Sequence, residues 1–174
     1  KVVELATFIA APCCARFLAD LGAEVIKVEA PAGVPLRYTA VNEAAADQKE
    51  NTSYDLENAG KTCVCLNTKT ASRPRGAGKA HRRRGHLHHQ LRQNPLKKAA
   101  LDYDTLHAKY PKLVYGFVSG YGEKGPDKDL PGFDFTAFFA RGGVLGTLFD
   151  KDSLPMLTIA GFGDHQVGMY LASG

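Results

Sequence analysis

The sequence predicts an α/β protein built on a doubly wound, mostly parallel β-sheet. Short segments with the apolar alternation of strands recur along the chain, and segments with helical apolar spacing lie between them. A strand, a helix and a second strand at this spacing are typical of parallel pairing through a crossover helix. The 174 residues are 44% hydrophobic and 23% charged, which is enough to bury one core. No apolar run reaches the roughly 18 residues that a membrane-spanning helix needs.

The first half of the chain contains a strand–helix–strand unit and a further strand. Pro12 favours the start of a helix that continues to Asp20, and Gly22 ends that helix. The three strands are expected at residues 1–5, 23–29 and 62–67.

The second half resumes the alternation. A helix is expected at residues 101–110 and a strand at residues 112–120, followed by a loop rich in Gly and Pro up to residue 134. Residues 135–142 favour a short helix. Asp164 lies at the N-cap or in the first turn of the last helix, just before an apolar stretch.

The cysteines give no sign of a disulfide framework or a metal site. They form one adjacent pair and one i, i+2 pair, and neither spacing suits a tetrahedral metal or a dithiol redox motif. We expect reduced thiols in a core, no metal and a cytoplasmic location for a chain with these four cysteines: Cys13, Cys14, Cys63 and Cys65.

Residues 71–90 depart from the α/β pattern. They contain six basic residues and no acidic one, so they exceed the whole net charge of +4 and leave −2 for the rest of the chain. The segment has neither helical nor strand periodicity. An RNA-binding arm that neutralises phosphates is one interpretation. A metal-binding tract is another, with four imidazole ligands: His81, His86, His88 and His89.

A third interpretation is a shifted reading frame. Residues 80–91, AHRRRGHLHHQL, can be encoded by codons that read LIADADIFITN after the loss of one base, and residues 72–81 can conceal RGREALEKLI. The shifted strings describe an amphipathic helix and an apolar strand, which are the elements that the alternation lacks here. We expect residues 71–90 to be frameshifted and, as printed, to leave sheet edges uncovered. Sequencing the coding DNA decides between the three interpretations.

Four ordered segments resemble the class III CoA-transferase family, which includes formyl-CoA transferase, carnitine CoA-transferases and α-methylacyl-CoA racemase. They are VVELATFIAAPCCARFLADLGAEVIKVEAP, ENAGKTCVCLNTKT, LVYGFVSGYGEKGP with PGFD, and GFGDHQVGMYLASG. The phosphate-loop signatures GxGxxG and GxxxxGK[ST] are absent. The resemblance implies a Rossmann-like sheet in the large domain of an interlocked homodimer. Residues 1–174 would be an incomplete N-terminal CoA-binding domain that lacks the small domain and the C-terminal part.

The resemblance also implies acyl-CoA chemistry with Asp164 as the nucleophile. Attack on the thioester would give a mixed anhydride and free thiolate, and return of the thiolate would give an aspartyl-CoA thioester. A carboxylate at a helix N-terminus is stabilised as the anion by about 0.3–1 kcal/mol, and the adjacent glycines would admit a bulky thioester. The alternative for Asp164 is a plain N-cap.

Six more residues match positions that contact CoA in the family: Leu66, Lys69, Arg92, Lys98, Gly120 and Tyr121. The backbone at Leu66 is expected to contact adenine, and the three cations are expected to meet the nucleotide phosphates. Taken singly, each of these cations is more often a solvated surface charge. Arg37 is a weaker candidate for the same role.

Racemases that resemble this family have a His before the Asp of the GxD motif, where this chain has Phe133. Two-base proton transfer then lacks a partner, which favours a transferase. His165 lies beside Asp164, but adjacent helical residues point about 100° apart, so we interpret it as a flanking residue. Four phenylalanines could line an acyl pocket or pack in the core: Phe133, Phe135, Phe138 and Phe139.

A narrower resemblance is to the subgroup that moves CoA among (R)-2-hydroxy acids such as phenyllactate and 2-hydroxyisocaproate. The expected partners are an acyl-CoA, a small carboxylic acid and, in the complete protein, a second copy of the chain; neither membrane nor nucleic acid is expected. The chain as printed is expected to be inactive. The alternatives are an acyl-CoA racemase and a non-catalytic nucleotide- or RNA-binding module.

Overall fold

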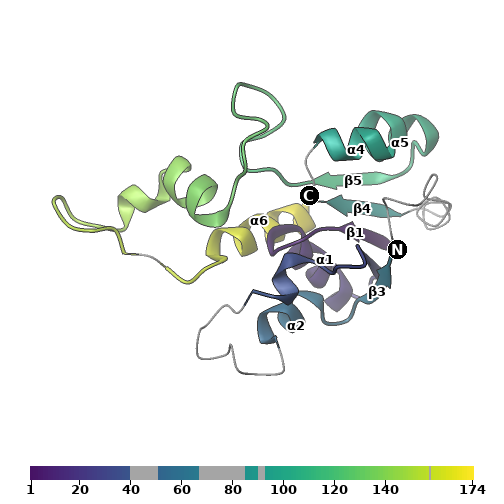
Figure 1. Ribbon diagram of the computed structural model, residues 1–174, viewed down its shortest axis with the longest axis horizontal. Coiled ribbons are helices and arrows are strands. Elements are labelled where there is room, and N and C mark those ends of the chain that lie inside the picture. The colour runs from purple at the N-terminus through teal and green to yellow at the C-terminus, as the bar shows by residue number, and fades with distance from the viewer. Residues whose placement is uncertain (40–50, 67–84, 90–92, 157) are drawn as a thin grey trace.

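Five parallel strands form one sheet in the part of the chain that the structure, a computed structural model, describes (Figure 1). The described residues are 1–39, 51–66, 85–89, 93–156 and 158–174. The strand order is β3-β2-β1-β4-β5, so the chain steps outward from β1 in one direction and then in the other. This order confirms the predicted doubly wound sheet. The strands are β1 (Val2–Leu5), β2 (Val25–Glu29), β3 (Thr62–Cys65), β4 (His86–His89) and β5 (Val114–Phe117).

Helices connect the strands and cover both faces of the sheet. Val2 packs with Ala15 of α1 (Ala10–Asp20), whereas the next residue, Val3, packs with Leu106 of α5 (Tyr103–Lys109) on the opposite face. The segment between β5 and α6 extends away from the sheet (Figure 1). No helix in the described ranges is long and apolar enough to cross a bilayer. The helices are α1 (Ala10–Asp20), η1 (Pro35–Arg37), α2 (Thr52–Asn58), α4 (Gln93–Ala99), α5 (Tyr103–Lys109), the π-helix η3 (Asp134–Arg141), η4 (Val144–Thr147) and α6 (Phe162–Ser173).

Most of the predicted elements are confirmed with small shifts at their ends. The first helix begins at Ala10 rather than at Pro12. Pro12 is tolerated in the first turn because the backbone N–H groups there have no acceptor within the helix, so the missing N–H costs no hydrogen bond. The helix α2 was not predicted. The expectation of core cysteines holds for Cys13 and Cys14, which are buried, and is wrong for Cys63 and Cys65, because β3 is an exposed edge strand.

A buried ion network crosses the face of the sheet below α1. Glu4 of β1 accepts from Lys27 Nζ of β2 at 2.6 Å and from Lys61 Nζ at 2.7 Å. All three side chains are almost completely buried. Lys61 also donates to the carbonyl of Pro12 in α1 at 2.8 Å. Each charge therefore has a partner, and the network links two strands, the first helix and the chain after α2.

The strand β4 is built from residues 86–89, which fall in the segment that the sequence marks as foreign to the fold. It pairs with β1 and β5, so the expectation of an uncovered sheet edge is wrong for this part of the segment. Residues 71–84 and 90 lie outside the described residues. The side chain of His88 faces α1, where its Nδ1 lies 3.2 Å from Cys14 Sγ. Its Nε2 is buried with no hydrogen-bond partner in the described structure, and burial lowers the pKa of His88 to about 4.

Candidate active site

The N-terminus of α6 lies over the loop that joins β1 to α1, at the carboxyl edge of the sheet. A Cβ on Gly161 would come within 2.8 Å of Ile9 Cδ1, and a Cβ on Gly168 would lie 2.6 Å from the carbonyl oxygen of Ala10. The glycine at 168 thus permits α6 to pack directly on the first turn of α1. Since β1 and β4 are the strands where the order reverses, this is the position at which doubly wound folds bind ligands.

Asp134 holds the first turn of α6. Its Oδ2 accepts from the amide of Gly161 at 2.8 Å, and its Oδ1 accepts from the amide of Asp164 at 3.1 Å. The carboxylate is buried, and it comes from the start of η3, 27 to 30 residues earlier in the chain. Two of the amides at the start of α6, those of Gly161 and Asp164, are therefore satisfied by Asp134.

Asp164 lies in the first turn, three residues after the N-cap Gly161, so the alternative that it is itself the N-cap is wrong. Its carboxylate makes no hydrogen bond within the described residues and is partly buried. Burial, reinforced by the charge of Asp134, raises the pKa of Asp164 to about 6. The expected stabilisation of the anion by the helix is therefore outweighed by the loss of solvent and by a second carboxylate. The result is an anion at neutral pH that is more basic than an ordinary aspartate.

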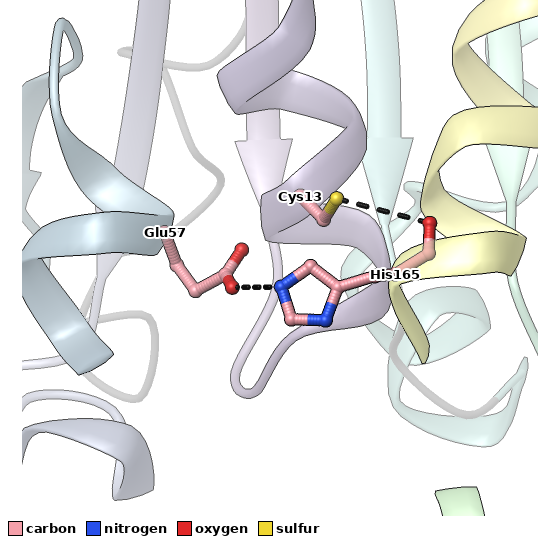
Figure 2. Close-up of side chains that lie close together, drawn as sticks. All are labelled: Cys13, Glu57 and His165. Carbon is pink, nitrogen blue, oxygen red and sulfur yellow. Dashed lines mark hydrogen bonds and ion pairs between the residues drawn. The ribbon is translucent and has the colours of Figure 1, made fainter. Parts of the chain in front are cut away.

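His165 was interpreted from the sequence as a residue that only flanks Asp164, and this interpretation is wrong because its ring makes two contacts within the site. Its Nε2 lies 2.7 Å from Oε1 of Glu57 in α2 (Figure 2). Its Nδ1 lies 2.6 Å from the carbonyl oxygen of Gly161. Glu57 is buried, and burial raises its pKa, while His165 and Lys61 act in the opposite direction. Glu57 and His165 are 108 residues apart, so no local sequence pattern could have paired them.

Cys13 completes a cluster with these two residues (Figure 2). Its Sγ, a carboxylate oxygen of Glu57 and a ring nitrogen of His165 lie within 4.8 Å of one another, a donor set that zinc accepts. However, burial raises the pKa of the Cys13 thiol to about 12, and the thiol lies 3.9 Å from the carbonyl oxygen of His165. The 2.7 Å contact between Glu57 and His165 is a hydrogen bond. In the structure, Glu57 and His165 are thus paired with each other, and the thiol of Cys13 faces a backbone carbonyl.

The glycines beside Asp164 make room for protein atoms. A Cβ on Gly163 would lie 2.3 Å from the ring of Phe138 and 2.6 Å from Oδ1 of Asp134. Gly161 has a φ of 84°, which favours glycine. The expectation that these glycines admit a thioester is therefore replaced by a packing role, because η3 fills the space.

Of the four phenylalanines predicted to line a pocket or to pack in the core, two pack on α6 and two are exposed. Phe138 and Phe139 pack on Phe162 of α6 with ring centroids 6.4 and 6.2 Å apart, so they support the first turn of that helix. Phe133 is more than half exposed, and its ring lies edge-on to Phe8, 6.3 Å away, in the loop between β1 and α1. Phe135 is also exposed, so two of the four phenylalanines are open to solvent.

Four of the six candidate CoA-binding residues lie in the part of the chain that the structure describes: Leu66, Lys98, Gly120 and Tyr121. No hydrogen bond, ion pair or ring contact in the described structure joins any of them to the carboxylate of Asp164. Leu66 is partly buried after β3, and its amide donates to the carbonyl of Glu29 at 2.8 Å. Lys98 is exposed near the end of α4. Lys69 and Arg92 lie outside the described residues.

Gly120 and Tyr121 follow β5 and thus share the carboxyl edge of the sheet with Leu66. A Cβ on Gly120 would lie 2.4 Å from Cα of Gly132, so the loop after β5 touches the loop before η3. The guanidinium of Arg141 lies 5.7 Å from the centroid of the Tyr121 ring.

The weaker candidate Arg37 is engaged elsewhere. Its Nε donates to Oε2 of Glu29 at 2.7 Å, and its guanidinium also stacks over Tyr54 and donates to the hydroxyl of that residue. Nε and one NH2 group of Arg37 are thus committed to Glu29 and Tyr54, and a role of Arg37 toward a phosphate stays a prediction.

Comparison with known proteins assigns the family. A family model described as CoA-transferase family III matches residues 1–174. The chain belongs to this family. It is 57% identical over 175 residues to the cinnamoyl-CoA:phenyllactate CoA-transferase of Clostridium sporogenes, covering 100% of this chain and 42% of that protein. It is 45% identical to the (R)-2-hydroxy-4-methylpentanoate CoA-transferase of Clostridioides difficile, covering 100% of this chain and 44% of that protein.

Structural comparison agrees with the family III assignment. A crystal structure of a CAIB/BAIF family protein from Brucella suis matches with a TM-score of 0.82 at 29% identity, covering 99% of this chain and 46% of that one. The chain therefore spans less than half the length of the relatives it matches. The family resemblance and the α/β fold predicted from the sequence are confirmed.

Proposed function

We propose that the transferase to which this chain belongs moves CoA from an acyl-CoA to a carboxylic acid, with Asp164 as the nucleophile. The observation that carries the proposal is the state of this carboxylate. It lies at the ligand-binding edge of the sheet, it has no hydrogen bond among the described residues, and its pKa is raised to about 6. At neutral pH such a group is ionised, and it is a stronger nucleophile than an aspartate with hydrogen-bonded oxygens.

The proposed reaction uses the carboxylate twice. Asp164 attacks the thioester carbonyl, the C–S bond breaks, and CoA leaves as the thiolate from an acyl–aspartyl anhydride. The thiolate then attacks the aspartyl carbonyl and releases the first acid, which leaves an aspartyl-CoA thioester. Attack by the acceptor carboxylate on that thioester forms a second anhydride, and the returning thiolate takes the new acyl group. Asp164 is regenerated as the carboxylate, and no proton needs to be added or removed.

The division of labour between the two carboxylates supports this role for Asp164. Asp134 is buried and accepts two amide hydrogen bonds, so it is committed to the structure of the first turn. Its fixed charge keeps Asp164 basic without competing for the substrate. His165 uses both ring nitrogens inside the protein, so it is not available as the second base that a racemase would need.

We further propose 2-hydroxy acids and their enoyl counterparts as the substrate class. The support is the similarity to two relatives whose names specify phenyllactate and (R)-2-hydroxy-4-methylpentanoate. The partly exposed ring of Phe133 beside the site is suited to an apolar acyl group. The proposed CoA contacts remain those given by the resemblance: Leu66, Lys69, Arg92, Lys98, Gly120 and Tyr121.

Replacement of the nucleophile tests the function directly. In a full-length transferase that carries this chain, Asp164→Ala should reduce kcat by about 10³-fold or more, because no other described carboxylate at the site is free to form the anhydride. Steady-state rates with cinnamoyl-CoA and phenyllactate measure the effect. A variant that keeps its full transferase activity would exclude Asp164 as the nucleophile.

A further inference from the structure

Glu57 and His165 form a pair that ties the turn carrying Asp164 to the helix α2. His165 follows Asp164 in α6, and its ring reaches back to the carbonyl of the N-cap Gly161. The amide of His165 also donates to that carbonyl, at 2.9 Å. The other ring nitrogen reaches across to Glu57 (Figure 2). The imidazole thus bridges the start of α6 and an element more than a hundred residues earlier in the chain.

The hydrogen bonds restrict where the protons of the pair can be. A carbonyl oxygen only accepts, so Nδ1 of His165 must carry a proton to bond Gly161. The nitrogen Nε2 then either accepts from a protonated Glu57 or donates to an ionised one. In both cases one proton lies between Nε2 and Oε1. Removal of that proton would place a nitrogen lone pair against a carboxylate, and the contact would become repulsive.

The surroundings do not offer Glu57 a substitute for this contact. Lys61 acts on Glu57 as a positive charge, but its ammonium is bound to Glu4 and to the carbonyl of Pro12. The thiol of Cys13 lies beside the pair in its protonated form. The titratable and charged groups that face the pair come from β1, α1, the chain after α2 and α6: Glu4, Cys13, Lys61 and Asp164.

We propose that Glu57 and His165 are positioning residues, which hold Asp164 in the attacking position by means of the proton they share. The inference rests on the proposed role of Asp164 as the nucleophile. Asp134 accepts from the amides of Gly161 and Asp164, and the ring of His165 bonds the carbonyl oxygen of Gly161. The backbone around Asp164 is thus fixed by both contacts, while the carboxylate oxygens of Asp164 make no hydrogen bond among the described residues. Loss of the shared proton at high pH releases one of the two contacts.

The chain offers matched variants that separate the two contacts of His165. Asn places its amide nitrogen where Nδ1 lies, so His165→Asn keeps a donor for the carbonyl of Gly161 and loses Glu57. Glu57→Ala removes the same contact from the other side. In Glu57→Gln, the amide N–H donates to Nε2, which keeps the contact but replaces the exchangeable proton with one that does not titrate.

The variants are compared in the full-length transferase by pH profiles of kcat and KM. His165→Asn and Glu57→Ala should lower kcat about tenfold to a hundredfold and leave the KM for acyl-CoA within about threefold, since a misplaced nucleophile affects the chemical step. Glu57→Gln should restore kcat to within about threefold of the wild type and should abolish the fall in rate at high pH. Thermal unfolding of each variant identifies those that lose structure as a whole.

Several results would overturn the inference. Glu57→Ala with the kcat and pH profile of the wild type would show that the pair positions nothing. If Glu57→Ala does not fold, a Glu57→Gln profile that keeps the basic limb leads to the same conclusion. Activity that is lost with a chelator in the wild type, and not in Glu57→Gln, would show that the cluster with Cys13 binds a metal in place of the proton. If Asp164→Ala stays active, the proposed function itself fails, whatever Glu57 does.

Discussion

The neighbouring strands β1 and β4 each bury a polar side chain, but only the one in β1 has all of its polar atoms paired. Glu4 and His88 are direct partners in the register of the two strands and lie at the same depth below α1. Both carboxylate oxygens of Glu4 bind an ammonium group. His88 has one contact, with the thiol of Cys14, and its buried Nε2 has no hydrogen-bond partner in the described structure.

The difference shows that burial alone does not decide whether a polar side chain stabilises the sheet. Removal of a buried charge that has two partners leaves those partners uncompensated, which is strongly destabilising. A buried imidazole with an unpaired nitrogen loses the hydrogen bonds that water would give it. Substitutions in the two strands should therefore change stability in opposite directions.

The largest effect is expected in β1. Glu4→Ala should lower the free energy of unfolding of the chain by about 3–5 kcal/mol, because the ammonium groups of Lys27 and Lys61 would stay buried without an anion. Urea denaturation at neutral pH measures the loss. The matched control is Glu24→Gln, which weakens the exposed ion pair with Lys1 and should cost less than about 1 kcal/mol. Equal losses in the two variants would contradict the contrast.

A gain in stability is expected at the proposed nucleophile. The pKa of Asp164 is raised to about 6 in the folded protein, so above pH 6 the folded state bears an ionised group that it disfavours. Asp164→Asn should therefore stabilise the chain by roughly 1–3 kcal/mol at pH 8, and the gain should shrink as the pH falls toward 5. Denaturation curves at the two pH values test the sign. A variant that is less stable than the wild type at pH 8 would contradict the claim that the ionised carboxylate of Asp164 destabilises the folded state.

The smallest effect at neutral pH is expected in β4. His88→Leu should stabilise the chain by about 1 kcal/mol at pH 7.5, since it removes a buried nitrogen without a partner and nearly preserves volume. The folded pKa of His88, about 4, lies below its unfolded value, so the wild type should lose stability as the pH falls below about 6.5. The variant should lose less over the same range. Identical acid denaturation of the two proteins would show that His88 does not carry this sensitivity.

The contrast also bears on the hypothesis of a shifted reading frame. The shifted string places Ile-Phe-Ile-Thr at residues 86–89, and those side chains suit a buried central strand better than two buried imidazoles do. The frameshift stays a prediction until the coding DNA around residues 71 and 90 is read.

The sequence predicted the fold well because its signals are local. The alternation in residues 1–5 and 23–29 and the proline near the start of α1 lie within a few residues of the elements they specify. The family resemblance added Asp164 as the nucleophile. The roles of Asp134, Glu57 and His165 could not be predicted, because each depends on a contact made across the fold, over 27 to 108 residues of chain. The raised pKa of Asp164 is of the same kind, since burial and a distant carboxylate produce it.

The fate of the oxygen atoms of the acceptor acid gives the most direct test of Asp164 as the nucleophile. In the proposed reaction, the acceptor carboxylate leaves one of its oxygens on the aspartate when the second anhydride breaks. Turnover of the full-length transferase with an acceptor labelled with ¹⁸O in its carboxylate should therefore place one labelled oxygen per cycle, and up to two after many cycles, in the peptide that contains Asp164, as read by mass spectrometry. Label in another peptide, or none after many turnovers, would contradict the account.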